Sequence, residues 1–177
     1  VAVAALAGVG RHVILRPAVQ KRYLELSEPT LEDQTSDLER VLQAMDDIEP
    51  RVPLEVVRAM GHTLREANWN VTAVLVDDVL VDVEPGDTTA RRFAIAYDLG
   101  TTTCVATLLD LETGLPAAVQ SILNMQQPFG ADVITRISAT MMAPAALGMP
   151  GDRAHETLAT LTPEVFEEPG VDPSECY

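Results

Sequence analysis

The stretch that decides the fold reads Phe93-Ala94-Ile95-Ala96-Tyr97-Asp98-Leu99-Gly100-Thr101-Thr102-Thr103-Cys104-Val105-Ala106-Thr107-Leu108-Leu109-Asp110. Two short apolar runs flank a polar centre, and both runs are rich in the small and β-branched residues typical of strands. The polar residues gather where the chain must reverse, and Gly100 lets the backbone bend sharply there. The pattern predicts a β-hairpin with polar groups at its tip.

The tip of this hairpin carries groups that suit a phosphate and a metal ion. N–H groups and hydroxyls of residues 100–103 can donate to phosphate oxygens, and a carboxylate can hold a hydrated Mg²⁺. An ordinary Gly/Thr turn stays the alternative, because turns favour the same residue types. We expect the candidate site to consist of Asp98, Gly100, Thr101, Thr102 and Thr103, with Asp98 as the metal ligand.

The composition bounds the classes of partner. With 177 residues, 47% of them hydrophobic, the chain can form one ordinary domain or two small ones. Its 12 Lys and Arg against 27 Asp and Glu give a net charge of -15. This excess repels nucleic acid and anionic membranes, so we expect neither as a partner. A nucleotide is still a possible ligand, because local N–H groups and a metal ion can outweigh the repulsion from the net negative charge.

The cysteines and the start of the chain lead to further expectations. Cys104 and Cys176 are too few for a disulfide scaffold or for a four-thiolate cluster held by one chain, and we expect Cys104 in the core. The apolar residues 1–9 are too short to span a bilayer and lack the basic residues of a secretion signal, which favours a strand or the remnant of an upstream domain. Since the chain starts at Val1, we expect it to be a piece of a longer protein.

The residues before the hairpin predict a small α+β unit. Ser36 and Glu39 have capping-box spacing, and apolar residues recur at helical intervals after Ser36 and after Pro53. The expected elements are extended segments at 13–17 and 23–26, a helix of about ten residues after Ser36, a helix from Pro53 to about Glu66, and strands at 69–76 and 79–84. One helix on one hairpin is too small to be stable unless it packs on a neighbour.

After the hairpin we expect a third strand at 117–123, a helix from Asp132, and two short helical pieces at 152–161 and from Thr162 onward. Asp132 is expected to place a favourable charge at a helix start. Arg136 is expected to pair with Asp132 or to face a ligand, and the pair is the commoner arrangement. His62 and His155 have no partner at ligand spacing and receive no metal role.

Several stretches together resemble a known family. Residues 96–103 look like the first phosphate motif of the superfamily of acetate and sugar kinases, heat-shock chaperone ATPases and actin. A longer series of matches is similar to the reductive activators of corrinoid proteins. The matching stretches, in family order, are 21–26, 29–40, 83–89, 128–137 and 170–177.

The resemblance implies a mixed α+β and α/β fold. Residues 1–50 would be a linker with the remnant of an upstream region, 51–92 a small helix-plus-hairpin middle domain, and 93–177 the first strands and helix of an actin-like, ribonuclease H-like ATP-binding domain. It implies ATP and Mg²⁺ as cofactors, with Asp98 binding Mg²⁺ through water and residues 100–103 cradling the phosphates. A [2Fe–2S] cluster is expected only in a ferredoxin domain upstream of this chain.

The resemblance also implies a function. The family is similar to ATP-dependent electron donors that return Co(II) corrinoid to Co(I) in a cytoplasmic corrinoid protein or corrinoid-dependent methyltransferase; a homodimer stays open. Because the second phosphate motif and the adenosine motif would lie beyond Tyr177, we expect these residues alone neither to hydrolyse ATP appreciably nor to transfer electrons. The alternatives are a sugar-kinase-like phosphotransferase and a non-enzymatic interaction module with a vestigial hairpin.

Overall fold

The computed structural model describes residues 15–142, 148–167 and 169–177. Their contacts group them into two compact units, one ending at Arg92 and also including Tyr177, and the other running over Phe93–Cys176. The division after Arg92 coincides with the expected start of the ATP-binding domain. The expected division between residues 50 and 51 falls inside the first unit.

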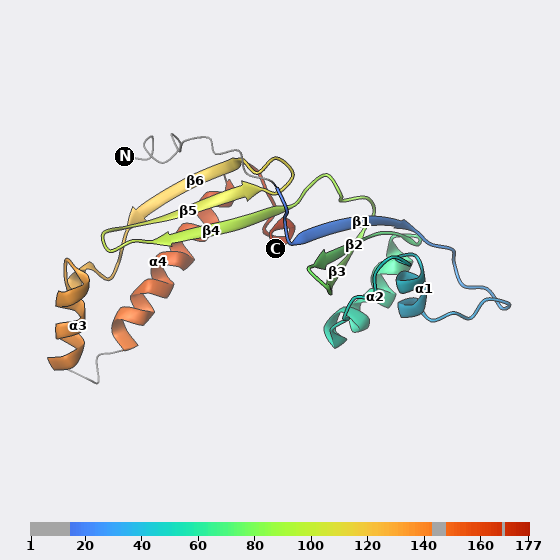
Figure 1. Cartoon of the computed structure of the whole chain (residues 1–177), viewed down its shortest axis with the longest axis horizontal. Coiled ribbons are helices and arrows are strands. Elements are labelled where there is room, and N and C mark those ends of the chain that lie inside the picture. Colours follow the sequence, from blue (N-terminus) through green and yellow to red (C-terminus); the bar gives the residue numbers. More distant parts are fainter. Residues whose placement is uncertain (1–14, 143–147, 168) are drawn as a thin grey trace. The chain divides into compact units, whose positions relative to one another are not determined.

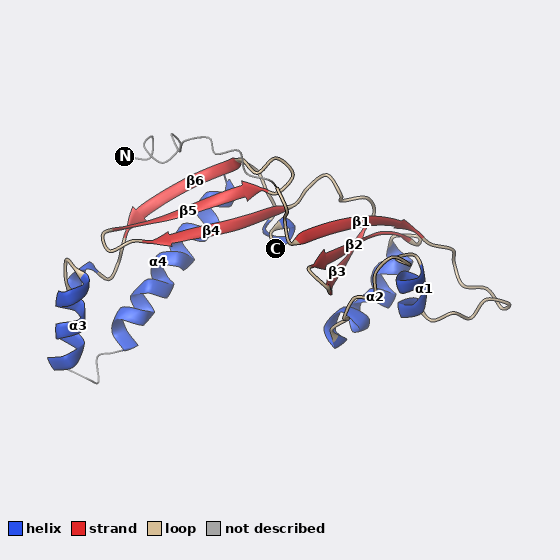
Figure 2. Ribbon diagram, viewed as in Figure 1, coloured by secondary structure: helices blue, strands red, loops and turns tan. Residues whose placement is uncertain are grey.

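The first unit is an antiparallel sheet with two helices on one face (Figures 1 and 2). The sheet order is β1-β2-β3, and a bulge interrupts the β2–β3 register between Val74 and Leu75. Buried side chains of the helices and the sheet form one apolar core. The elements are β1 (Val19–Glu25), α1 (Asp37–Gln43), α2 (Leu54–Glu66), β2 (Asn70–Val76) and β3 (Val79–Pro85).

Local sequence signals explain both helices. The Glu39 N–H donates to Ser36 Oγ and the Ser36 N–H donates to the Glu39 carboxylate, so the predicted capping box is confirmed. The second helix starts directly after Pro53, as predicted, and turns Val56, Met60 and Leu64 into the core. These three residues recur at intervals of four, which places them on one helix face.

Strand β1 completes this unit. It pairs with β2 along its whole length, from Val19 opposite Val76 to Glu25 opposite Asn70. Leu24 on β1 and Val41 on α1 are both buried in the same core as α2. The segment expected to be a linker therefore supplies the third strand and second helix that a lone helix and hairpin would lack.

The second unit is built on the predicted hairpin. Strands β4 and β5 pair antiparallel, and β6 pairs with the other edge of β5, so the hairpin and the third strand are confirmed. Helix α4 lies across one face of this sheet (Figure 2). The elements are β4 (Phe93–Leu99), β5 (Thr103–Asp110), β6 (Pro116–Leu123), η2 (Gln127–Phe129), α3 (Val133–Met142), α4 (Gly148–Glu167) and η4 (Pro173–Glu175).

Helix α4 corrects one prediction. In place of two short pieces it is a single helix of 20 residues with Pro163 inside. A proline inside a helix costs about 3 kcal/mol, because it removes a hydrogen bond and crowds the preceding turn. Val165 and Phe166, beyond the proline, are buried together with Leu161 against β5, and this packing offsets the cost.

The core of the second unit follows strand alternation. Cys104, Ala106 and Leu108 of β5 are fully buried and face α4. The expectation that Cys104 is a core residue is confirmed. Among the described helices, none combines the length and apolar character that a membrane crossing requires.

Candidate functional site

The five predicted site residues lie at one end of the second sheet, next to α3 (Figure 1). Asp98 is exposed near the end of β4, residues 100–102 form the turn, and Thr103 begins β5. Tyr97 hydrogen-bonds Thr162 of α4 at 2.6 Å, so its neighbour Asp98 projects from the opposite face of the strand. Asp98 and Thr103 therefore share the face of the sheet that α4 does not cover.

Gly100 is required by close packing in this turn. A Cβ built on Gly100 would lie 2.6 Å from the Thr103 carbonyl oxygen, well inside van der Waals contact. The atom it would meet belongs to the backbone, so no side-chain rotation can relieve the overlap. Only glycine fits the turn as it stands.

We expect Gly100→Ala to lower the free energy of unfolding of the second unit by about 1–3 kcal/mol, because the added methyl forces the turn to move. Urea denaturation followed by circular dichroism measures the change. The matched control is Gly151→Ala in α4, where a Cβ meets open space. That change should be neutral or stabilising by up to about 1 kcal/mol, and equal losses in the two variants would contradict the account of Gly100.

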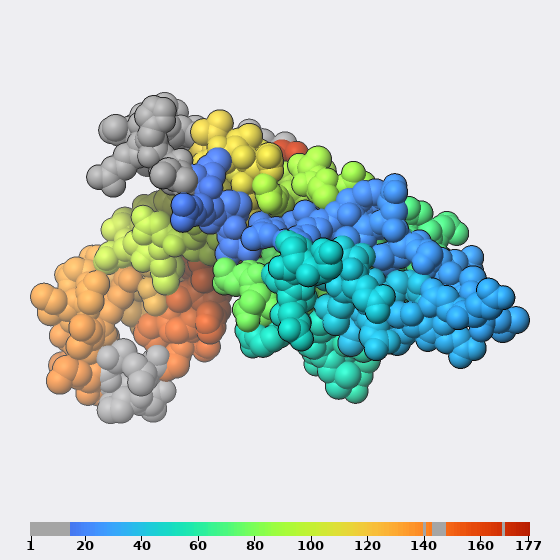
Figure 3. All heavy atoms as spheres, turned by 45° about the vertical axis from the view of Figure 1, so that its right-hand side comes forward, coloured from blue at the N-terminus to red at the C-terminus, as the bar shows by residue number. Residues whose placement is uncertain are grey.

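Two residues that follow β6 bind the carbonyl groups of the turn. Asn124 Nδ2 donates to Gly100 O at 2.8 Å, and the Asn124 N–H donates to Thr102 O at 2.9 Å. The guanidinium of Arg136, on α3, donates to Thr101 O between them. Asn124 and Arg136 together thus bind the three successive carbonyls of residues 100–102. In the space-filling view the lime-green end of the β4–β5 hairpin lies against the orange α3 segment (Figure 3).

The loop that carries Asn124 is itself anchored to α4. The Met125 N–H donates to Thr157 Oγ1 at 3.2 Å, and Gln126 Nε2 donates to Pro150 O at 2.8 Å. Asn124 is only 1% exposed and Thr157 is fully buried. Buried polar groups with all their partners in place are rigid, so α4 fixes the loop and the loop fixes the turn.

Asp132 and Arg136 do not form the predicted pair. Asp132 accepts from the Thr135 N–H at 2.8 Å and from its hydroxyl at 3.0 Å. These two bonds lower the pKa of the Asp132 carboxyl, the backbone bond most strongly. Arg136 points toward the turn instead, so the pairing prediction is wrong. The favourable charge expected at the helix start is confirmed, since Asp132 caps the first turn of α3.

The comparison with known proteins follows the division into units. Residues 8–90 match the family model described as the RACo linker region, and residues 93–177 match the model described as the RACo middle region. The chain belongs to the reductive activators of corrinoid proteins. The family's linker region includes every described element of the first unit, and its middle region spans the second.

Two relatives of the activator family are similar over different shares of the chain. A solved structure described as a reductive activator for corrinoid, iron–sulfur protein superposes with a TM-score of 0.77 at 28% identity, covering 95% of this chain and 28% of that chain. The corrinoid activation enzyme RamQ of Eubacterium limosum is 35% identical over 85 residues, or 48% of this chain and 14% of that protein. The chain thus spans under a third of the length of these relatives, and the mixed α/β fold is confirmed.

Among the described residues of this family member, no three His, Cys, Asp or Glu side chains converge as a metal site. His62 is exposed on α2 with its Nε2 3.2 Å from Glu66, and His155 is exposed on α4. Of the five predicted site residues, Asp98 alone carries a carboxylate. That fits the ion, which usually keeps several waters and takes its other ligands from substrate phosphates.

Cys104 lies directly behind the candidate site but has no reactive character. Burial raises the pKa of its thiol, and the negative charge of Asp98 acts in the same direction. The thiol therefore stays protonated at neutral pH, and a protonated thiol is a poor nucleophile. Cys104 serves as core packing under the hairpin tip.

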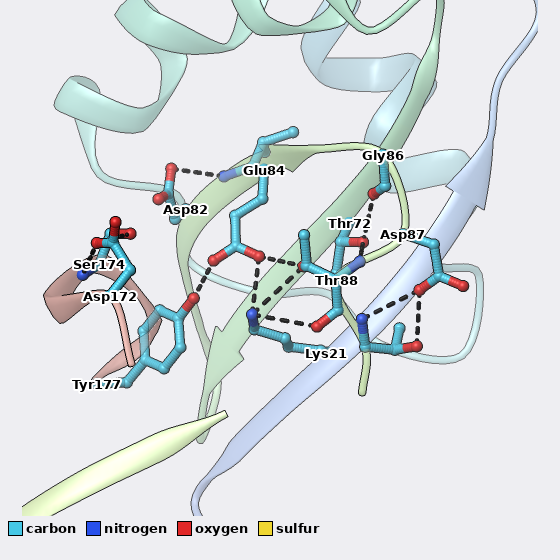
Figure 4. Close-up of polar contacts among 12 residues, drawn as sticks. Lys21, Thr72, Asp82, Glu84, Gly86, Asp87, Thr88, Asp172, Ser174 and Tyr177 are labelled. Carbon is cyan, nitrogen blue, oxygen red and sulfur yellow. Dashed lines mark hydrogen bonds and ion pairs between the residues drawn. The ribbon is translucent and has the colours of Figure 1, made fainter. Parts of the chain in front are cut away.

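A buried ion pair organises the polar contacts of the first unit (Figure 4). Lys21 Nζ lies 2.8 Å from Glu84 Oε2, and the Lys21 side chain is 1% exposed. The hydroxyls of Thr88 and Tyr177 both donate to the Glu84 carboxylate, and the Lys21 ammonium lies 5.1 Å from the centre of the Tyr177 ring. Two buried charges are tolerated where, as here, both are paired and hydrogen-bonded.

This cluster gives a structural reason for part of the family resemblance. Its residues come from three of the matching stretches, 21–26, 83–89 and 170–177, which are far apart in sequence. Sequence reasoning found little chemistry in the first of them, because a lysine in a strand gives no sign of its partner. The contacts give one residue or two of each stretch a part in holding the first unit together: Lys21, Glu84 and Thr88, and Tyr177.

Proposed function

We propose that this chain forms the linker and middle regions of an ATP-dependent reductive activator. The activator passes one electron to Co(II) corrinoid in a corrinoid protein or corrinoid-dependent methyltransferase, which gives Co(I). A [2Fe–2S] cluster held by a segment outside the described residues would supply that electron. Family membership supports this role, as do the names of the two relatives, a corrinoid activation enzyme and a reductive activator for a corrinoid, iron–sulfur protein.

The observation that carries the nucleotide part of the proposal is the built hairpin tip. The turn admits only glycine at Gly100, and Asn124 and Arg136 bind three of its carbonyls. Asp98 and Thr103 share the face of the sheet that α4 does not cover. In the proposal Asp98 holds hydrated Mg²⁺, and residues 100–103 bind the nucleotide phosphates as the start of an actin-like ATPase domain. The ion supplies charge neutralisation of the phosphates when bound.

Replacing Asp98 tests the proposal. In a polypeptide that contains residues 1–177 and binds Mg·ATP, Asp98→Asn should weaken that binding at least about tenfold, because it removes the charge that holds the hydrated ion. Isothermal titration with Mg·ATP measures the affinity.

The matched control for this measurement is Asp77→Asn. Asp77 is an exposed aspartate in the β2–β3 turn with φ of 52°, a conformation that asparagine also adopts. This change removes the same charge away from the site and should leave the affinity unchanged. Full Mg·ATP affinity in Asp98→Asn, or no Mg·ATP binding by the unsubstituted protein, would overturn the nucleotide role of the tip.

A further inference from the structure

We propose that Asn124 and Arg136 are positioning residues that turn the N–H groups of the hairpin tip toward a bound phosphate. The inference rests on the proposed function of the tip and adds the residues that orient it. Neither residue contacts the ligand in this account. Both act through the backbone carbonyls of residues 100–102.

Peptide geometry carries the argument. In a planar trans peptide the carbonyl of one residue and the N–H of the next point in opposite directions, and the described residues contain no cis peptide bond. Asn124 and Arg136 draw the carbonyls of residues 100, 101 and 102 toward themselves. The N–H groups of Thr101 and Thr103 therefore point away from Asn124, and the N–H of Thr102 points away from Arg136. Asn124 and Arg136 both donate to Gln126 Oε1, so they lie side by side. Successive N–H groups on one side of a turn are the usual anion donors.

Arg136 suits this role because its guanidinium is a planar fork. Besides the bond to Thr101 O, it donates to Gln126 Oε1 at 3.0 Å and to Gly130 O at 3.0 Å. One side chain thus ties the turn, the loop after β6 and the start of the α3 segment. The ammonium of a lysine is a point charge on a flexible stem and cannot reproduce this fork.

The backbone around Gly130 permits the approach of Arg136. Gly130 has φ of 150°, and a Cβ built there would lie 2.8 Å from both the Arg136 backbone nitrogen and Thr135 Cβ. A side chain at this position would push the start of α3 away. Together with the anchoring of Met125 and Gln126 to α4, this close approach preorganises the positioning residues before any ligand binds.

The test separates geometry from charge with Arg136→Lys, which keeps the positive charge and loses the fork. We expect the Mg·ATP affinity to fall about 10- to 100-fold, as for the loss of hydrogen bonds to a charged group. Amide hydrogen exchange at residues 101–103 should become faster in the absence of nucleotide.

Asn124→Ala should change the Mg·ATP affinity and the amide exchange in the same direction. Both variants are checked for an unchanged urea midpoint. Arg153→Lys, an exposed arginine of α4 that pairs with Glu156, is the matched control and should change neither readout.

The outcomes are distinct. If the unsubstituted polypeptide binds Mg·ATP and both variants retain its affinity within about twofold, the positioning role is overturned and the proposed function stands. If Arg136→Lys keeps full affinity while Arg136→Ala loses it, Arg136 acts by charge and the positioning role is again overturned. If the unsubstituted polypeptide binds no Mg·ATP, the proposed function falls and this inference falls with it.

Discussion

Glu84→Ala is expected to lower the free energy of unfolding of the first unit by about 3–5 kcal/mol, the usual cost of removing one partner from a buried ion pair. The substitution leaves the Lys21 ammonium, whose side chain is 1% exposed, without its carboxylate. It also removes the acceptor for the hydroxyls of Thr88 and Tyr177. A charge stranded in this way cannot regain its hydration without opening the sheet.

Urea denaturation measures this loss, and an exposed ion pair provides the control. Asp78→Ala removes the partner of Arg51, but both of those side chains are more than half exposed, so the loss of stability should be much smaller than that of Glu84→Ala. The double variant Lys21→Met, Glu84→Leu should recover much of the stability, because it removes both charges. If Glu84→Ala costs no more than Asp78→Ala, the cluster does not organise the first unit.

The second large effect is expected in the core of the same unit. Leu64→Ala should lower the free energy of unfolding by about 2–5 kcal/mol, because the Leu64 side chain is fully buried between α2 and the sheet and its loss leaves a cavity. Leu54→Ala, on the same helix but 57% exposed, should change it by no more than about 0.5 kcal/mol.

Urea denaturation followed by circular dichroism compares these two variants, and an unchanged dependence on urea shows that both still fold to the same state. Similar losses from the two leucines would mean that α2 does not pack on the sheet as described. The comparison is informative because the two residues have the same chemistry and the same helix, and differ in burial.

Short-range patterns in the sequence predicted most of the elements. The capping box at Ser36, the run of apolar residues in β2 and the polar turn of the β4–β5 hairpin are all set by residues within a few positions of one another. The pairing of β1 with β2 could not be predicted in this way, because Val19 and its partner Val76 are far apart in sequence. Nor could local propensity show that helix α4 continues through Pro163. The helix continues because Val165 and Phe166, which follow the proline, are buried in the core of the second unit.

The candidate site, too, could be predicted only where its residues are close together in sequence. Residues 98–103 could be predicted as a candidate site because their polar groups are adjacent in sequence. Asn124 was missed and Arg136 was assigned to Asp132, because their bonds to the turn join residues 24 and 35 positions apart. The sequence left open that Arg136 faces a ligand instead of pairing with Asp132, but only the fold shows that it reaches Thr101 O.

The central claim is that the N–H groups of the hairpin tip bind the phosphates of Mg·ATP, and amide chemical shifts test it most directly. A polypeptide that contains residues 1–177 is labelled with ¹⁵N and titrated with Mg·ATP, alongside Asp98→Asn. The account predicts saturable shifts that are largest at Thr101, Thr102 and Thr103 and that are lost or strongly weakened in the variant. Saturable binding of Mg·ATP with these three amides unmoved would contradict it.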